Sequence, residues 1–384
     1  MTACAVLAGI AVAVAAVVVW VAAPAGGPAA PPPLADCARL QADRAAQREC
    51  SVAAMLRDLR APGDPTPALE QINADVDRIG SYPAANCHVL MHTVGRRYAR
   101  LHGVTLATLM EALPRSNDPG CAAGFAHGVI TAIAPDVLRA GSAAAGKLCG
   151  AASTRFQRYS CVHGLGHAYM RFYDASLTPA LRLCRALGAG SAPDCAQGAY
   201  HDYWLAIAGL DETRPPAEAI GDVRTLCARQ PRPFVRACWY RSFIDTRPAG
   251  YETSAAGDLT RICAGTTALQ RQACITAASV IGSPNPLRQM RVCSQLPRPD
   301  VLACVRGVKV QNLLGTPPRN QLRVIARCAW LRSDLATGCY EWLGKVLAVI
   351  TDGAFEQRGC PQVAQPRACR RGARSIDGPL VTFS

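Results

Sequence analysis

The sequence lacks the short motifs of the common catalytic and nucleotide-binding sites. It contains no Gly-x-Ser-x-Gly elbow, no phosphate-binding P-loop and no dinucleotide-binding fingerprint. It also contains no Cys-x-x-Cys motif, which argues against a zinc ribbon or finger. Because Cys-x2-Cys-His is missing as well, the sequence gives no site for covalent attachment of a c-type haem.

Lysine is scarce, although the chain is strongly basic. Only three of the 41 basic residues are lysines, and the formal net charge is +14. Such a charge favours contact with anionic surfaces such as lipid head groups, cell-wall polymers or nucleic acid. The arginines are scattered rather than gathered into a patch, so the pattern argues against nucleic acid as a specific partner.

Charged side chains are absent from the first 23 residues. This apolar run reaches the roughly 20 residues that a membrane-spanning helix needs, and it lacks the basic start of an ordinary signal peptide. Two interpretations stay open: an uncleaved transmembrane anchor at the cell membrane, or a signal peptide cleaved near Ala23, which would leave a secreted or periplasmic protein. Both place the rest of the chain outside the cytoplasm. We therefore predict a signal or anchor at 1–23, a Pro/Ala-rich linker at 24–36, histidine-containing helical repeats at 37–205 and cysteine-bridged helical repeats at 206–384.

Nineteen cysteines set the predicted fold. Without Cys4 an even number remains in an exported chain, which indicates disulfides. From residue 149 onward they fall into seven successive pairs, five of them eleven residues apart: Cys149/Cys161, Cys184/Cys195, Cys227/Cys238, Cys263/Cys274, Cys293/Cys304, Cys328/Cys339 and Cys360/Cys369. The pairs recur every 30 to 43 residues or so, an interval typical of helical-hairpin repeats.

Each unit reads as two short helices joined by a bridge. An amphipathic stretch ends on the first cysteine, and a second helix, with Asp300 as one predicted N-cap, opens just before the second cysteine. One such bridge stabilises a hairpin by about 2–3 kcal/mol. Cys37 and Cys50 fit an opening hairpin, and we predict that Cys87 and Cys121 pair across adjacent repeats. The predicted fold is all-α, a right-handed α-solenoid of eight or nine disulfide-stapled hairpins behind the N-terminal hydrophobic segment.

Small residues recur three positions after the second cysteine of a pair. Glycine lies there in five units, at Gly124, Gly164, Gly198, Gly307 and Gly372. Without a side chain, such a position lets a neighbouring helix come close. We predict a packing role for these glycines.

All seven histidines lie between residues 88 and 201, and six follow the cysteine register. His92 lies five residues after a cysteine, and His127, His167 and His201 each lie six after one, which predicts a ladder along one face of the solenoid. His88 and His163 precede two of them by four residues and share their helix face. Imidazole nitrogens suit zinc, copper or iron, so these six are candidate metal ligands. The polar and aromatic residues Tyr169, Tyr200 and Asp202 are candidates for the lining or outer shell of a metal or cofactor pocket.

Other interpretations of the histidines remain open. Neither His-x3-His segment contains the glutamate that a zincin protease uses as its general base. The repeat could carry the histidines as structural hydrogen-bonding groups, or they could line a pocket without metal. The main alternative function is a solenoid scaffold that binds peptides or cell-envelope partners on its concave face. No catalytic residue stands out, so the sequence does not decide whether the protein is an enzyme.

The segments Cys87-His-x3-His92, Cys121-x2-Gly-Phe-x-His-Gly128 and Cys161-x-His-Gly-x-Gly-His167 carry a resemblance across roughly residues 85–205. The chain resembles a group of exported bacterial and archaeal Cys/His-rich helical-repeat proteins to which no activity is assigned, so the resemblance implies none. The architecture is also similar to that of tetratricopeptide and related helical-hairpin solenoids. Their signature residues are not reproduced here, so this similarity concerns architecture alone.

Overall fold

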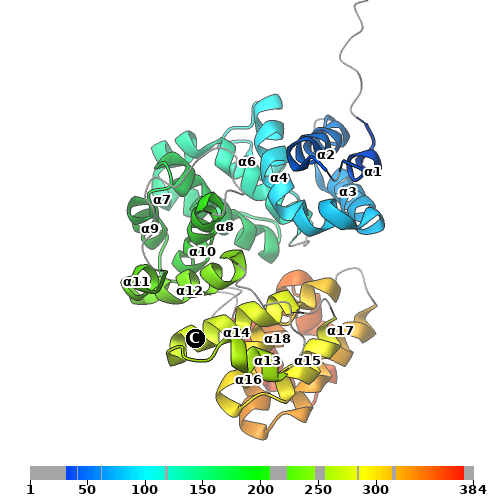
Figure 1. Ribbon diagram of the computed structural model, residues 1–384, viewed down its shortest axis with the longest axis vertical. Helices are drawn as coiled ribbons and strands as arrows, with labels where there is room; N and C mark the ends of the chain where they lie inside the picture. Colours follow the sequence, from blue (N-terminus) through cyan, green and yellow to red (C-terminus); the bar gives the residue numbers. More distant parts are fainter. Residues whose placement is uncertain are drawn as a thin grey trace, which may run out of the picture. The chain divides into compact units, whose positions relative to one another are not determined.

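The computed structural model describes residues 32–40, 42–61, 63–116, 120–207, 223–246, 256–282, 285–313 and 317–375. All regular elements in these ranges are helices (Figure 1), which confirms the predicted all-α fold. The predicted signal or anchor at 1–23, residues 24–31 of the predicted linker and Cys4 lie outside the described residues. The first helix, α1, spans Leu34–Cys37.

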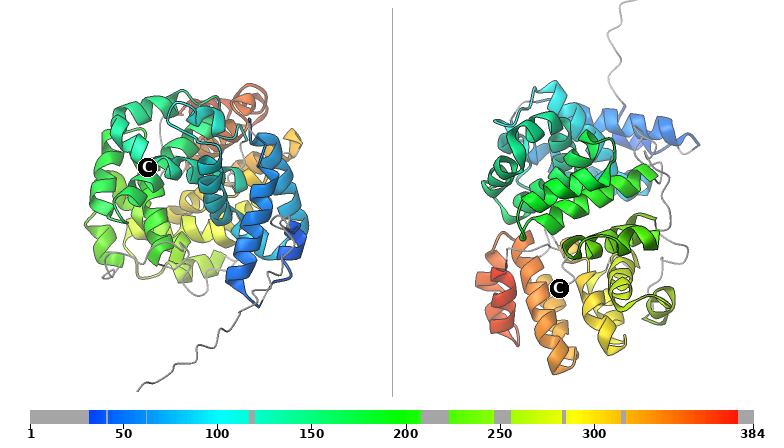
Figure 2. Two further views of the ribbon diagram at one scale, coloured as in Figure 1. Left: turned by 90° about the horizontal axis from the view of Figure 1, so that it is seen from above. Right: turned by 90° about the vertical axis from the view of Figure 1, so that its left-hand side faces the viewer.

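The main helices form a continuous series in which each packs against the next one but one along the chain (Figures 1 and 2). These are α2 (Arg44–Asp58), α4 (Ser81–Leu101), α6 (Cys121–Ala132), α8 (Arg155–Phe172), α10 (Ala192–Ile207), α12 (Arg232–Thr246), α14 (Ala268–Gly282), α16 (Arg298–Arg306), α18 (Ser333–Ile350) and α20 (Pro366–Arg374). Such sequential packing is the arrangement expected of a helical repeat.

Shorter or more amphipathic helices precede members of this series and pack beside them. They are α3 (Thr66–Ile79), α5 (Leu109–Ala112), α7 (Ala134–Gly150), α9 (Leu177–Ala186), α11 (Val223–Ala228), α13 (Ala256–Ile262), α15 (Pro286–Ser294), α17 (Pro318–Ile325) and α19 (Ala354–Arg358), with 3-10 turns at Val310–Leu313, Ala326–Trp330 and Cys360–Gln362. Ordinary N-caps start several helices; the Thr154 side chain, for example, accepts a hydrogen bond from the backbone N–H of Gln157 at the start of α8.

Nine disulfides connect the helices, and every predicted pair is present. Cys37 is bonded to Cys50 and Cys87 to Cys121, with the seven regular pairs following. Their Cα–Cα distances of 5.2–5.8 Å lie in the normal range for disulfides. The predicted stapled hairpins are therefore confirmed.

The second cysteine of a pair often lies deeper in its helix than predicted. Cys304 is the seventh residue of α16, since that helix already begins at Arg298. Pro299 explains the early start, because proline is favoured in the first turn of a helix, where its missing N–H has no intrahelical acceptor.

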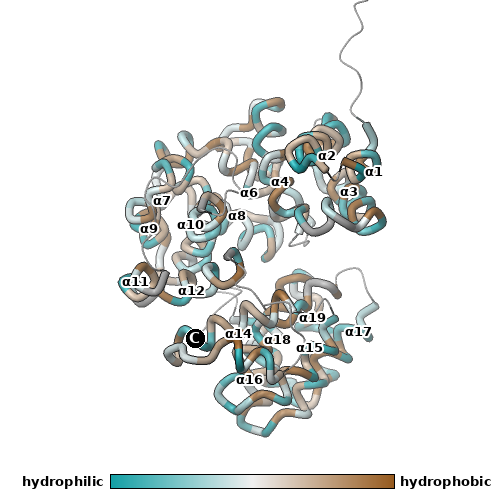
Figure 3. Tube along the Cα trace, viewed as in Figure 1, coloured by the Kyte–Doolittle hydropathy of each residue, from teal (hydrophilic) through white to brown (hydrophobic). Residues whose placement is uncertain are grey.

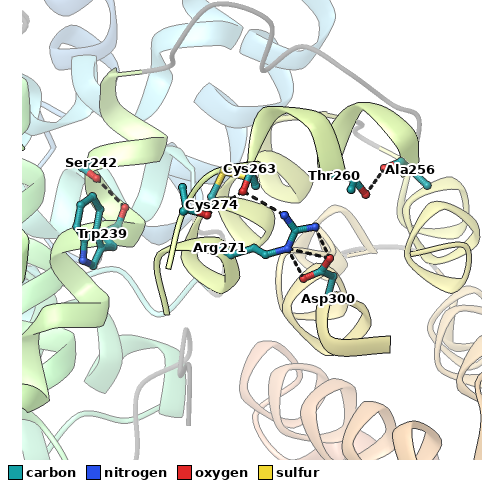
Figure 4. Close-up of a disulfide and its surroundings, with 9 residues drawn as sticks. Trp239, Ser242, Ala256, Thr260, Cys263, Arg271, Cys274 and Asp300 are labelled. Atoms are coloured by element: carbon teal, nitrogen blue, oxygen red, sulfur yellow. Dashed lines mark hydrogen bonds and ion pairs between the residues drawn. A yellow bond between two sulfur atoms is a disulfide. The ribbon is translucent and has the colours of Figure 1, made fainter. Parts of the chain in front are cut away.

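The prediction that Asp300 caps α16 is wrong. The N-cap is Pro297, and Asp300 lies in the first turn with only 1% of its surface exposed. Its carboxylate instead accepts hydrogen bonds from the Arg271 guanidinium of α14 at 2.7–3.1 Å, as Figure 4 shows. Arg271 also donates to the carbonyl oxygen of Cys263, beside the disulfide to Cys274. This ion pair joins two consecutive repeats.

Glycines bring consecutive main helices into backbone contact, as predicted. A Cβ atom added at Gly124 would lie 2.2 Å from the carbonyl oxygen of His88, and one added at Gly198 would lie 1.9 Å from that of His163. Gly128, one turn beyond Gly124, meets the carbonyl oxygen of His92 in the same way, at 2.2 Å. Side chains essentially never come this close, so only glycine permits these helix spacings.

Apolar and polar residues are mixed along the helices (Figure 3), whereas α6 is almost entirely buried. Eleven of its twelve residues, Cys121 to Thr131, are buried. Within the ranges that the structure describes, no single helix is long and apolar enough to cross a membrane. Among the described helices, only α6 and α7 taken together pass that test of length and composition, and the pair is bent by 95°.

Candidate metal centre

Six histidines from four consecutive main helices come together in one cluster. Helix α4 supplies His88 and His92, α6 supplies His127, α8 supplies His163 and His167, and α10 supplies His201. Eleven pairs of their rings have centroids between 4.7 and 6.2 Å apart. We name this group of six residues the histidine cluster.

The cluster is more compact than the predicted ladder. Neighbouring helices pack about 8–10 Å apart, so a straight row would separate α4 from α10 by about 24–30 Å. The rings of His92 and His201 are nevertheless only 5.8 Å apart, and those of His88 and His201 only 5.5 Å. The four helices must therefore direct these side chains toward a common point rather than along a line.

Burial leaves several ring nitrogens of the cluster without a hydrogen bond. Five of the six histidines are at most 7% exposed, and His88 is partly buried. On the cluster histidines other than His88, five buried ring nitrogens have no hydrogen-bond partner within the described part of the chain: Nε2 of His92, Nδ1 and Nε2 of His127, Nδ1 of His163 and Nε2 of His167. Buried polar atoms are normally paired, so this concentration of unpaired nitrogens is unusual.

Two histidines are oriented by hydrogen bonds to oxygen atoms. Nδ1 of His88 lies 3.1 Å from the carbonyl oxygen of Gly120, and Nδ1 of His167 lies 3.2 Å from Oδ1 of Asp202. Because both partner oxygens accept, each Nδ1 carries a proton, and in the neutral form of the ring Nε2 then has the free lone pair. A carboxylate or carbonyl behind a ligand histidine is the usual second layer of a metal site.

His201 is held differently. Its Nδ1 accepts a hydrogen bond from the guanidinium of Arg241, which also binds both carboxylate oxygens of Asp245 at 2.8 and 3.0 Å. An acceptor at Nδ1 places the proton of a neutral ring on Nε2. In its neutral form, His201 therefore has a hydrogen-bond donor at Nε2 rather than a lone pair.

The other five histidines form two triads, each with nitrogens close enough to hold a metal ion. One triad is His88, His92 and His127, and the other is His127, His163 and His167. Within each triad the candidate ligand atoms lie within 4.8 Å of one another. His127 belongs to both triads.

Burial also sets the protonation of the cluster. It lowers the pKa values of His92, His127, His163 and His201 well below the usual 6.5 because desolvation penalises the charged ring, and neighbouring imidazoles or Arg241 add to this effect. These four rings are therefore neutral at physiological pH. Neutral imidazole is the form that binds metals.

The other predicted site residues have different positions. Asp202 contacts His167, as an outer-shell residue would. The Tyr169 hydroxyl instead donates to Ser142 at 3.4 Å, and the fully buried Tyr200 hydroxyl has no partner within the described ranges.

Sequence reasoning missed Arg241, which lies on α12, beyond the last histidine. It occupies the position three residues after Cys238, where other units have glycine. The arginine at a position that is glycine in other units was the sequence feature that could have identified it.

A separate cavity of about 490 Å³ lies beside α9, α11 and α12. Three arginines, Arg182, Arg185 and Arg229, contribute to its lining, but none of the six histidines does. The histidine cluster therefore does not line this cavity.

Comparison with family models, curated proteins and solved structures yields no match for this chain. Its class therefore follows from the fold and the site: an all-α, disulfide-bridged helical array with buried histidine triads that could hold a metal ion. Nine disulfides indicate an oxidising compartment outside the cytoplasm.

Proposed function

We propose that this protein binds a transition metal ion, zinc, copper or iron, in its histidine cluster outside the cytoplasm. Imidazole nitrogen suits each of these metals. Thiolate ligands play no part, because all the cysteines in the described ranges are joined in disulfides. Ligation falls to the five histidines of the two triads, with Asp202 orienting His167.

The observation that carries the proposal is the set of five unpaired, buried ring nitrogens. Leaving one buried polar group unsatisfied costs about 1–3 kcal/mol, so five would cost on the order of 5–15 kcal/mol together. That sum is as large as the whole folding stability of a typical domain. Metal coordination through these lone pairs would remove much of the penalty.

A purely structural role explains the cluster less well. Histidines that serve as packing groups would hydrogen-bond to the backbone between repeats, as Nδ1 of His88 does. His92, His127 and His163 have no such backbone bond at the nitrogens named above. The scaffold alternative, with peptide or cell-envelope partners, remains the interpretation to adopt if the protein holds no metal.

Attachment to the membrane through residues 1–23 is part of the proposal. It is supported by the uncharged, apolar character of that segment. A cleaved signal would give a soluble form with the same histidine cluster.

Metal content measured by elemental mass spectrometry tests the proposal. The chain from residue 32 onward, exported through an oxidising compartment and purified without a metal-binding tag, should contain one or more transition metal ions per molecule. The double variant His92→Gln/His167→Gln removes one ligand from each triad and should lose nearly all of the metal. Asp202→Asn should keep the ligands but weaken metal affinity by about 10–100-fold.

The seventh histidine provides the matched control. His102 packs against Tyr98, with ring centroids 4.3 Å apart, and belongs to neither triad. His102→Gln should retain the wild-type metal content. Wild-type protein that folds with its nine disulfides yet stays metal-free when offered zinc, copper and iron would contradict the proposal.

A further inference from the structure

We propose that the histidine cluster holds two metal ions joined by the ring of His127, which binds one ion through each of its nitrogens. The inference rests on the metal-binding function proposed above and specifies its form. Each ion would take a pair of histidines from one helix, His88 and His92 of α4 or His163 and His167 of α8, together with the shared ring.

His127 has the position that such a bridge requires. Its ring centroid lies 5.2 and 5.4 Å from those of the α4 pair and 4.7 and 5.1 Å from those of the α8 pair. It is the only residue that the two triads, as found among the described residues, have in common. It lies on α6, which packs between α4 and α8.

Both nitrogens of His127 are available for coordination. Each is buried, and neither has a hydrogen-bond partner among the described residues. A histidine that binds one metal ion normally donates its other N–H to a carboxylate, a backbone carbonyl or water. Within the described ranges no carboxylate or carbonyl performs that role for His127, whereas Asp202 performs it for His167.

The hydrogen bonds around the cluster distinguish bridging from terminal ligands. His88 and His167 each use Nδ1 for an outer oxygen, so each can offer only Nε2 to a metal. They belong to different triads and flank His127 from different helices. This arrangement fits terminal ligands on either side of a bridging ring.

Charge also favours a bridging imidazolate. When the second ion binds, His127 gives up its remaining N–H proton to solvent, and each ring nitrogen then has a lone pair that can bind a metal ion. No electron is transferred in this step. The resulting negative charge offsets part of the positive charge that two ions bring into a buried site whose other ligands are neutral, and Asp202 adds a second negative charge nearby.

Loading with Cu(II) tests the bridge directly. Metal-free, disulfide-intact chain from residue 32 onward would be titrated with Cu(II) in air, and bound copper would be compared with the unpaired spins counted by electron paramagnetic resonance. We expect about two copper ions per chain. The spin count should fall far below the bound copper at liquid-helium temperature and rise on warming, because a bridging imidazolate couples the two spins antiferromagnetically.

Two variants and one control complete the test. His127→Phe should abolish the coupling, so that the copper that remains is fully visible in the spectrum. His92→Phe should leave one uncoupled copper in the His127, His163, His167 triad. His102→Phe should reproduce the coupled wild-type spectrum, and circular dichroism would confirm that each variant is folded.

The outcomes separate this inference from the proposed function. One copper per wild-type chain, or two with a full spin count at all temperatures, would overturn the bridge while leaving metal binding intact. No bound copper, zinc or iron in the wild type would overturn both. These decisive measurements use the wild-type protein, so they stand even if a variant fails to fold.

Discussion

Substitution of Gly128 by alanine should disturb the histidine cluster without touching any histidine. The added Cβ would lie 2.2 Å from the carbonyl oxygen of His92 and 3.0 Å from the backbone nitrogen of Arg96, both on α4. Ordinary van der Waals contact begins at 3.4 Å. The two helices must therefore separate by roughly 1 Å, because protein interiors are closely packed and have few voids that could take up the added methyl group.

Two opposing effects set the magnitude. Overpacking of this kind costs about 1–3 kcal/mol, and this contact belongs at the upper end because backbone atoms cannot rotate away. Alanine gains about 1 kcal/mol over glycine from its helix propensity. We expect a net loss of about 1–2 kcal/mol in the free energy of unfolding. Metal affinity should fall more than about 10-fold, because ligand distances tolerate only about ±0.2 Å.

Urea denaturation and a competition titration against a metal chelator would measure the two quantities. Gly150→Ala is the matched control, because Gly150 ends α7 and no atom lies within 4 Å of its added Cβ. That variant should be as stable as the wild type or slightly more so, with unchanged metal affinity. If Gly128→Ala behaved like Gly150→Ala in both assays, the argument that glycine contacts position the histidines would be refuted.

Two further predictions concern stability. The four buried histidines with lowered pKa values take up protons near pH 6.5 only when the chain unfolds, so the stability of the metal-free protein should fall with pH below that value. Between pH 7.5 and 5.5 the free energy of unfolding should fall by about 1.4 kcal/mol for each ring, or up to about 5 kcal/mol in total. Urea midpoints that do not change over this range would contradict the burial of neutral imidazoles. Arg271→Met should cost about 3–5 kcal/mol, because it leaves the buried Asp300 carboxylate without its ion partner. Arg261→Met, which removes only the exposed pair with Asp258, should cost less than about 1 kcal/mol, and equal urea midpoints for these two variants would show that burial of the pair is unimportant.

The disulfide pattern was predictable because it is local. Each bridge connects one cysteine to the next along the chain, so spacing alone identified the hairpins, and the pairing of Cys87 with Cys121 followed from the absence of nearer partners. The glycine contacts were predictable for the same reason. A small residue that lies at the same distance from the cysteine on each successive helix faces the neighbouring helix each time.

The shape of the histidine cluster was not predictable in this way. The constant spacing between cysteine and histidine predicted a row of histidines on successive helices. Whether that row is straight depends on how each helix is rotated relative to the one before, and the spacing does not encode this rotation. The anchoring of His201 by Arg241 is also a tertiary effect across 40 residues of sequence. Asp300 failed as a predicted cap because the helix started earlier and a cation from α14 was within reach.

Once the site is known, by contrast, the sequence shows which helix is the last to contribute a histidine to the cluster. The position that holds His127, His167 and His201 holds Ile244 in α12 and Val280 in α14. The repeat continues there with apolar residues, so the helices after α10 add no histidine to the cluster, although Arg241 of α12 contacts His201.

The strictly consecutive order of the nine bridges has a consequence for how the protein is made. Eighteen cysteines can pair in more than 10⁷ ways, on the order of 3 × 10⁷ by the usual counting. A chain that leaves an export channel N-terminus first presents each cysteine's native partner before any other unpaired cysteine follows. Oxidation during translocation therefore favours the native pairs, because each cysteine meets its native partner first. Maturation should need an oxidant but little disulfide isomerase.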